Sequence, residues 1–316
     1  MKRNLPQAIE YYLATRRSLG FALVKDGVEL RGLIRYAKKI GHTGPLTAQL
    51  ALAWAKLPKQ AQRPYWAVRL NIVRRFAQFW VAYDARTEIP SADPFGPTYR
   101  RRAYIFTPQE IAALLVAASQ WARVQTAPLH GWTFCTVLGL LQCTGLRIGE
   151  ALRLEDKDVD WSAGVLTIRH AKHGHARLIP VQPSTLTALR RYRSLRDKAI
   201  APSLARAFFV TPGGQPQGYD GICAVFRSLC GQLGWSQQPV PRLHDLRHTF
   251  TVRTLLSWYQ SGQPVEAKLW TLSTYLGHRH LADTYWYLTA VPELMQLCQQ
   301  RFATAQAWAS GGMSHD

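Results

Sequence analysis

A proline-rich break near residue 90 divides this chain and limits the folds that it can adopt. Residues 85–104 contain three prolines and no helical period, and they include an arginine triplet at Arg100, Arg101 and Arg102. Such a break separates domains, and a chain of 316 residues is long enough for two. We therefore predict an N-terminal helical domain over residues 1–90, a linker over 91–105 and a larger domain over 106–316.

The positive charge is concentrated ahead of this break. Residues 1–104 hold 19 Lys or Arg and 6 Asp or Glu, whereas residues 105–316 hold 20 and 13. The whole chain carries +20, an excess that suits a polyanionic partner better than a small metabolite. A membrane surface would also attract this charge, but the arginines are spread over several segments, which favours nucleic acid.

One amphipathic helix in the basic region carries candidate DNA contacts. Over residues 64–83, Arg69, Arg74 and Arg75 are interleaved with apolar residues. We expect these three arginines and the linker triplet to contact phosphates. The plain alternative is the solvated face that any amphipathic helix has.

The cysteines and the hydropathy of the chain indicate the cellular compartment in which the protein works. The five cysteines are odd in number and include no Cys-x-x-Cys pair, which argues against a disulfide framework and a zinc knuckle. The longest apolar runs are too short to cross a bilayer, and no hydrophobic segment follows the N-terminal charges as in a secretory signal. We expect a cytoplasmic protein without a membrane partner.

Hydrophobic spacing predicts a mainly α fold with a small antiparallel β-sheet in the second domain. Apolar residues recur at three-to-four spacing over residues 5–19, 28–40, 47–57 and 64–83. Thr107 and Glu110 then form a capping-box pattern, and an apolar helix over 132–143 ends at Gly145, with a short helix near Arg147. Strand-like segments follow at 159–161, 165–170 and 177–181, with a turn at 162–164 and a hairpin loop at 171–176. Helical spacing resumes at Pro183, is broken at 208–217, and ends in a helix over 292–308.

The second domain carries polar groups whose chemistry suits a phosphodiester. They lie on Arg147, Glu150, Lys172, His244, Arg247, His278 and Tyr287. Arginines bind non-bridging phosphate oxygens and offset charge in a pentavalent transition state, and a hydroxyl can attack phosphorus while Lys or His moves protons. The sequence has no carboxylate cluster for two metal ions, and no Walker A, His-Glu-x-x-His or nucleophile-elbow motif.

Each of these residues alone has an ordinary explanation. Arg147 follows a helix end and could lie on the surface, and Lys172 is in a polar hairpin loop where lysines are usually solvated. His244 and Arg247 share a helix face because they are three residues apart. The histidines at 170, 173, 175, 244, 248, 278 and 280 could be taken for a metal site, but none has a recognised zinc spacing.

The order of these residues resembles that of the tyrosine recombinases, the phage integrase family. The motif set is Arg147 within residues 144–152, Lys172 on a hairpin, His244 and Arg247 within 244–250, Leu276-Gly277-His278, and Tyr287 nine residues later. The resemblance covers the chain from Thr107 to its end. Layout and charge alone liken the first domain to the core-binding domain of that family, which implies a two-domain DNA clamp.

The resemblance implies a mechanism and a role for each residue. Tyr287 attacks the scissile phosphate, forms a 3′-phosphotyrosine and releases a 5′-hydroxyl, with no cofactor and no metal. Arg147, Arg247 and His278 stabilise the phosphorane, Lys172 is the general acid, His244 assists proton transfer at the tyrosine and Glu150 orients the site.

The resemblance also implies partners. The first partner is double-stranded DNA in the nucleoid. The others are further copies of the chain, which form a tetramer on two DNA sites. The resemblance also suggests that the protein serves a mobile element. In this family the last helix docks on a neighbouring subunit, whereas packing on its own domain is the alternative.

Two other functions stay open. A type IB topoisomerase-like enzyme would nick and close DNA by the same chemistry without joining two sites. A non-catalytic DNA-binding protein on the same scaffold would have lost one or more active positions, and none is lost here.

Three tyrosines near His278 compete for the role of nucleophile. Tyr285 and Tyr287 are two residues apart, about 200° around a helix, so both cannot face one phosphate. The nine-residue step from His278 favours Tyr287, and Tyr275 is expected on a packed helix face. We expect Asp283 and Thr284 to cap a short helix that has Tyr287 in its first turn.

Overall fold

The structure is a computed structural model of the 316-residue chain, and it describes residues 4–96, 101–169, 176–200, 206–236, 239–278, 280–289 and 292–311. The chain divides into two compact units, Met1–Arg101 and Arg102–Asp316. The division falls inside the stretch predicted as a linker. The two units are described separately below, and the clamp stays a prediction.

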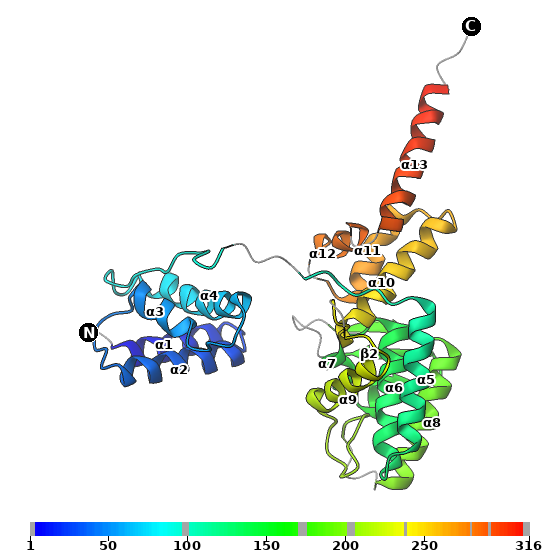
Figure 1. Cartoon of the computed structure of the whole chain (residues 1–316), viewed down its shortest axis with the longest axis horizontal. Coiled ribbons are helices and arrows are strands. Elements are labelled where there is room, and N and C mark those ends of the chain that lie inside the picture. Colours follow the sequence, from blue (N-terminus) through cyan, green and yellow to red (C-terminus); the bar gives the residue numbers. More distant parts are fainter. Residues whose placement is uncertain are drawn as a thin grey trace. The chain divides into compact units, whose positions relative to one another are not determined.

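The N-terminal unit consists of helices around one apolar core (Figure 1). The helices of its described part are α1 Leu5–Ser18, α2 Val24–Lys39, α3 Ala48–Ala55 and α4 Arg63–Trp80. Helix α1 begins where Asn4 and Gln7 form a capping box, and α3 begins where the Thr47 hydroxyl accepts from the Leu50 N–H. Their buried apolar stripes, including Ile9 and Trp54, meet in the core, as the predicted spacing requires.

The C-terminal unit is also mainly helical. Its larger helices are α5 Pro108–Arg123, α6 Pro128–Thr144, α8 Pro183–Ala199, α9 Tyr219–Gln232, α10 Leu243–Gln260, α11 Val265–Leu276 and α13 Pro292–Gly311. Shorter turns are α7 Ile148–Ala151, η1 Asp156–Asp158, α12 Ala282–Tyr285 and η3 Trp286–Thr289. The predicted capping box starts α5, since the Thr107 hydroxyl accepts from the Glu110 N–H at 3.1 Å and the Glu110 carboxylate accepts from the Thr107 N–H at 2.7 Å.

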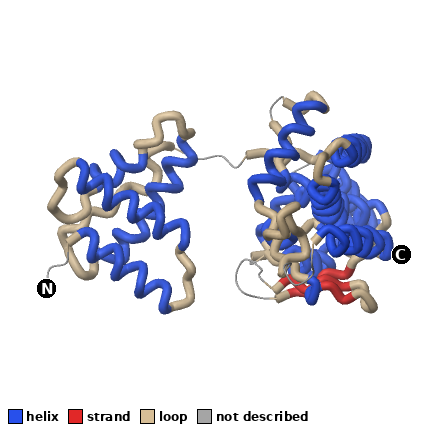
Figure 2. The backbone as a smooth tube through the Cα atoms, turned by 90° about the horizontal axis from the view of Figure 1, so that it is seen from below, coloured by secondary structure: helices blue, strands red, loops and turns tan. Residues whose placement is uncertain are grey.

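A three-stranded antiparallel sheet lies at one edge of this unit (Figure 2). Its strands are β1 Val159–Asp160, β2 Val165–Ile168 and β3 Arg177–Pro180, in the order β1-β2-β3. Leu166 pairs with Val159 on one side and with Ile179 on the other. These strands confirm the mainly α fold with a small antiparallel sheet, although the tip of the β2–β3 hairpin, residues 170–175, lies outside the described residues.

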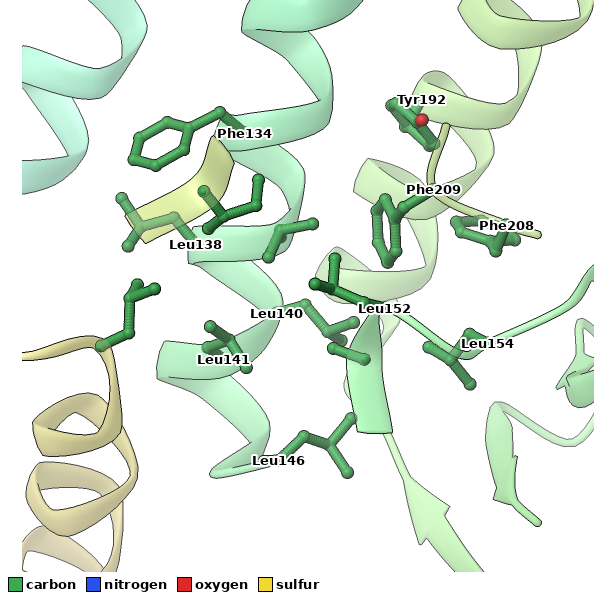
Figure 3. Close-up of a cluster of buried hydrophobic side chains, with 14 of the residues drawn as sticks. Phe134, Leu138, Leu140, Leu141, Leu146, Leu152, Leu154, Tyr192, Phe208 and Phe209 are labelled. Carbon is green, nitrogen blue, oxygen red and sulfur yellow. The ribbon is translucent and has the colours of Figure 1, made fainter. Parts of the chain in front are cut away.

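Helix α6 runs through the main core of the C-terminal unit. Its side chains Phe134, Leu138 and Leu141 are buried, and Figure 3 shows them near Tyr192 and Phe209 from neighbouring segments. A smaller cluster of buried residues joins α10, α11, η3 and the start of α13. This second cluster packs α11, η3 and the start of α13 against α10.

Helix α13 starts on this second cluster and then leaves it. Leu294 is fully buried, whereas Figure 1 shows the C-terminal part of the helix extending away from its unit. The helix covers the predicted range of 292–308 and three residues more. Among the described residues, no helix is long and apolar enough to cross a membrane.

Candidate active site

A glycine turn after α6 presents Arg147. Gly145 ends the helix with φ +63°, a left-handed conformation, and an added Cβ there would come within 2.4 Å of the Phe250 ring. Two residues on, Arg147 is extended at the N-cap of α7. Its backbone N–H donates to Glu150 Oε2 at 3.0 Å and its Nη1 donates to Oε1 at 2.9 Å. The short helix therefore fixes the guanidinium and the carboxylate against each other.

Glu150 is also held by a residue that the sequence analysis did not select. Arg177, the first residue of β3, donates to both oxygens of Glu150, at 3.1 and 2.7 Å, and its Nε donates to the Tyr275 carbonyl at 2.8 Å. Burial alone would raise the pKa of Glu150, but the hydrogen bonds and charge of Arg177, followed by those of Arg147, lower it overall. The carboxylate is therefore ionised at neutral pH although only 3% of Glu150 is exposed.

The two predicted arginines meet at the C-terminal end of α11. Arg147 donates to the carbonyls of Leu276 and Gly277, at 3.3 and 3.1 Å, and Arg247 donates to those of Leu276 and Gly145, at 2.6 and 2.9 Å. Carbonyls at a helix C-terminus carry partial negative charge, so they attract both cations. Burial and then the charge of Arg147 lower the pKa of Arg247 to about 10. Two guanidiniums that repel each other at one oxygen favour the binding of an anion between them.

Helix α10 contributes two histidines beside Arg247. His244 is exposed on the first turn, and His248 is buried one turn later, with the rings perpendicular and their centroids 4.6 Å apart. Burial and then the charge of Arg247 lower the pKa of His244 to about 4. The two histidines therefore lie together beside Arg247 but differ in their access to water.

His278 follows the left-handed Gly277 that ends α11. Its Nδ1 lies 2.8 Å from the Thr284 hydroxyl, and its ring is parallel to that of Tyr287 with centroids 6.1 Å apart. Burial, followed by the charges of Arg247 and Arg147, lowers the pKa of His278 to about 4. The ring is therefore neutral at pH 7 in the absence of an anion.

Tyr287 is the tyrosine that points into this cluster. It is 2% exposed, and its hydroxyl lies 3.1 Å from Nδ1 of His248. Tyr285 points the other way and is 47% exposed, as the spacing predicted. Tyr275 stacks on Phe250 with centroids 5.7 Å apart, and burial raises its pKa to about 12. The geometry therefore favours Tyr287 over its neighbours.

The local structure that holds Tyr287 differs from the prediction. Asp283 and Thr284 do not cap a helix; they lie inside α12, whose N-cap is Leu281, and Tyr287 follows in the 3₁₀ helix η3. The Thr284 hydroxyl is instead a partner of His278. The prediction was wrong because the turn begins two residues earlier than the capping residues suggested.

Arg177, His248 and Thr284 are site residues that sequence reasoning missed. A signal existed for two of them. Arg177 lies two residues before the buried Ile179 and therefore on the inward face of its strand, where a charge needs a partner. His248 is four residues after His244 and shares its helix face. Nothing in the sequence pairs Thr284 with a ring.

Lys172 and three of the histidines that were considered and rejected as a metal site cannot be placed. Lys172, His170, His173 and His175 all lie outside the described residues. In the part of the chain that the structure does describe, no three His, Cys, Asp or Glu side chains are close enough together to hold a metal ion. The described residues on either side of this gap are Arg169, after β2, and Ala176, before β3.

The candidate DNA-binding arginines differ in how far their side chains are exposed to solvent. Arg69 is buried, stacks on Trp54 at 3.9 Å and donates to its carbonyl, so it serves the core of its unit rather than a DNA surface. Arg74 donates to the Pro90 carbonyl at 2.6 Å, and Arg75 is half-exposed and paired with Asp26 at 2.8 Å. Arg101 and Arg102 are exposed, and Arg100 lies outside the described residues.

The assembled groups can carry out transfer of a phosphodiester to a hydroxyl. They comprise a phenol beside imidazoles, two converging guanidiniums and a buried carboxylate that orients one of them. Hydrogen-bond donors that already point to where negative charge develops usually contribute the largest single part of the transition-state stabilisation in such a reaction. Arg147 retains 24% of its side chain exposed, so the anion site opens to solvent on that side.

The chain is similar in sequence to known proteins. A family model described as the phage integrase family matches residues 105–293. The chain is 42% identical over 304 residues to a Sinorhizobium fredii protein named as an integrase/recombinase, y4rB, with 93% of this chain and 96% of that protein covered. It is 36% identical to a second protein of that organism, y4rE, over 95% of this chain and 96% of the other.

Solved structures with the same fold include proteins bound to DNA. One is the Tn1549 transposon integrase in complex with transposon right end DNA, with a TM-score of 0.65 at 18% identity over 95% of this chain and all of that one. Another is the XerH site-specific recombinase bound to a palindromic difH substrate, with a TM-score of 0.62 at 13% identity, covering 90% and 78% of the two chains. At these identities the similarity concerns the fold.

Proposed function

The chain belongs to the phage integrase family, and from this premise we propose that it is a tyrosine-type site-specific recombinase. It cleaves and rejoins double-stranded DNA through a 3′-phosphotyrosine intermediate, serves a mobile element and acts on nucleoid DNA in the cytoplasm. The observation that carries the proposal is the convergence of Arg147 and Arg247 on one carbonyl in the same side-chain cluster as the buried Tyr287 hydroxyl. The arginines supply the anion site and the tyrosine supplies the nucleophile.

The scissile phosphate replaces the helix carbonyls as the main partner of the two arginines. The Tyr287 oxygen attacks phosphorus, the bond to the 5′-oxygen breaks, and the new phosphotyrosine conserves the energy of the broken bond. Arg147, Arg247 and His278 stabilise the negative charge that grows on the non-bridging oxygens. Glu150 keeps the Arg147 guanidinium in place during this change.

Lys172 protonates the departing 5′-oxygen in this proposal. The support is its position in the sequence, in the loop between β2 and β3. Arg177, which follows that loop in the sequence and starts β3, donates to both oxygens of Glu150 at the anion site. Reversal of these steps, with a 5′-hydroxyl from a partner strand as the attacking group, completes the exchange.

A nicked suicide substrate tests the proposal. Its short 5′-hydroxyl fragment dissociates after cleavage and leaves a covalent adduct, which a denaturing gel detects and mass spectrometry maps. Tyr287→Phe should bind DNA and form no adduct, whereas Tyr285→Phe, the matched exposed neighbour, should form it at the normal rate. Absence of an adduct in the unaltered protein, or an adduct that persists in Tyr287→Phe, would refute the proposal.

The same reaction should not need a metal ion, because Arg147 and Arg247 supply the positive charge that a two-metal enzyme takes from its ions. Adduct formation should continue in EDTA. If chelation stops it and Mg²⁺ restores it, the roles given to the arginines are wrong.

We further propose that the enzyme works as a tetramer on two DNA sites. Helix α13 supports this, since it leaves its own unit and exposes half of Met295. Joining of two labelled duplexes separates a recombinase from a topoisomerase-like enzyme, which would relax a single plasmid without joining. Light scattering on the two-site complex should give four chains, and removal of residues 292–316 should lower that number.

A further inference from the structure

We infer that His248 is a further catalytic residue, which holds the hydroxyl of the nucleophile Tyr287 and takes up its proton during attack. The inference rests on the recombinase function proposed above. The family resemblance assigned proton transfer at the tyrosine to His244, one helical turn earlier. The geometry points to its neighbour instead.

The contact between the two side chains is direct. Nδ1 of His248 lies 3.1 Å from the Tyr287 hydroxyl, and the two rings are tilted by 52° with centroids 5.4 Å apart. A general base has to lie within hydrogen-bond distance of the proton that it removes, and this pair meets that requirement. His244 meets His248 edge-on instead, on the solvent side.

Both groups are shielded from water. Tyr287 is 2% exposed and His248 is 4% exposed, and the indole of Trp286 packs on the imidazole with centroids 5.3 Å apart. A buried phenol cannot lose its proton directly to solvent, so a protein group has to receive it.

The position of His248 on α10 also suits the reaction. The residue directly before it is Arg247, which donates to the Leu276 carbonyl at the anion site. One helix therefore carries both a phosphate ligand and the proton partner of the nucleophile. Because the two residues are adjacent on α10, the helix holds these two groups near each other.

The proposed step balances as follows. His248 has its ring proton on Nε2, so Nδ1 offers a lone pair to the phenol. The Tyr287 O–H bond breaks and its proton moves to Nδ1 while the tyrosine oxygen bonds to phosphorus. The bond from phosphorus to the 5′-oxygen breaks, and the leaving oxygen takes a different proton, from Lys172. In the rejoining reaction His248 returns its proton to the phenolate.

Chemical rescue tests this role. His248→Ala should slow adduct formation on the suicide substrate by about 100-fold or more, the size of a lost general base, while DNA binding is retained. Added imidazole should fill the space left by the side chain and restore the rate at least in part, which it cannot do for a defect in folding. His248→Asn keeps a hydrogen-bonding side chain but cannot take a proton, so it should stay slow.

His130→Ala is the matched control. His130 packs on Trp121 with centroids 5.3 Å apart, the same separation as His248 and Trp286, but it lies on the first turn of α6. Its removal should leave the rate unchanged with or without imidazole. An effect of imidazole on this variant would show that rescue is not specific.

A substrate with sulfur in place of the bridging 5′-oxygen distinguishes proton donation to the leaving group from proton removal at the tyrosine. The thiolate leaves without a proton, so this substrate should restore cleavage by Lys172→Ala and leave His248→Ala slow. Recovery of His248→Ala on this substrate would overturn the inference, and so would a normal rate in His248→Asn. No adduct in the unaltered protein would instead refute the recombinase function itself.

Discussion

Replacement of Arg177 by leucine should show how strongly the anion site depends on one buried ion pair. The guanidinium donates to both oxygens of Glu150 and to the Tyr275 carbonyl, and its side chain is only 9% exposed. Removal of one partner of a buried pair costs about 3–5 kcal/mol, because the other charge is left in a poorly solvated site. Glu150 keeps its bonds to Arg147, so we expect the lower end, about 3 kcal/mol.

Denaturant unfolding at pH 7 measures this loss, and a double-mutant cycle with Glu150→Gln assigns it. Glu150→Gln should cost less in the Arg177→Leu background than in the unaltered protein, since the partner is already gone. Arg193→Leu is the exposed control in the same unit. Arg193 lies 3.2 Å from Asp156, but its side chain is 44% exposed, so its loss should cost less than about 1 kcal/mol.

Acid gives an independent check on the same pair. The pKa of Glu150 is lower in the folded protein than its ordinary value of 4.5. Its charge therefore stabilises the fold above pH 4.5, and this contribution disappears as the pH falls through the folded pKa. The stability gap between the unaltered protein and Arg177→Leu should narrow below pH 4.5. A loss below about 1 kcal/mol at pH 7, or a gap that acid does not narrow, would refute the reasoning.

Other consequences can be measured separately. Gly145→Ala should destabilise the C-terminal unit by about 2 kcal/mol or more in thermal unfolding, since φ is +63° and the Phe250 ring lies 2.4 Å from the new Cβ. Gly139→Ala, within the helix that Gly145 ends, meets nothing within 4 Å and should stabilise the unit by about 0.5–1 kcal/mol. The pKa of His278 should rise from about 4 when DNA phosphate binds, so that binding takes up a proton and tightens as the pH falls toward 4; calorimetry in two buffers detects this uptake, and His278→Gln should reduce it. Arg101→Gln with Arg102→Gln should lower the salt slope of DNA binding by about 0.9 for each phosphate that the protein no longer neutralises, without changing sequence preference, and an unchanged slope would remove both residues from the interface.

Local signals in the sequence predicted much of the fold. Thr107 with Glu110 marked the start of α5, Gly145 marked the end of α6, and three-to-four spacing found the N-terminal helices to within a few residues. These features depend on neighbours in the chain. The order of polar motifs selected Arg147 and Arg247, which the structure brings together from residues 100 apart in the sequence.

What the sequence could not predict depends on contacts between distant elements. Arg69 has the sequence pattern of a surface arginine on an amphipathic helix, but its stacking on Trp54 buries it. His248 was passed over in favour of His244 because the partner of each ring is decided by η3, which lies about 40 residues later. The turn that holds Tyr287 was misplaced because short helices have weak end signals.

The carbonyl of Leu276 has a consequence for how this site can be studied and how it can change. Both guanidiniums contact an atom of the main chain, which every amino acid at that position would supply. Alanine scanning at residue 276 would therefore report only on apolar packing and would miss the contribution of the oxygen. Only a backbone substitution, such as an ester at that linkage that weakens the acceptor, reports on it directly. The oxygen therefore depends on the path of the backbone, whereas the buried side chain of Leu276 is constrained only by apolar packing.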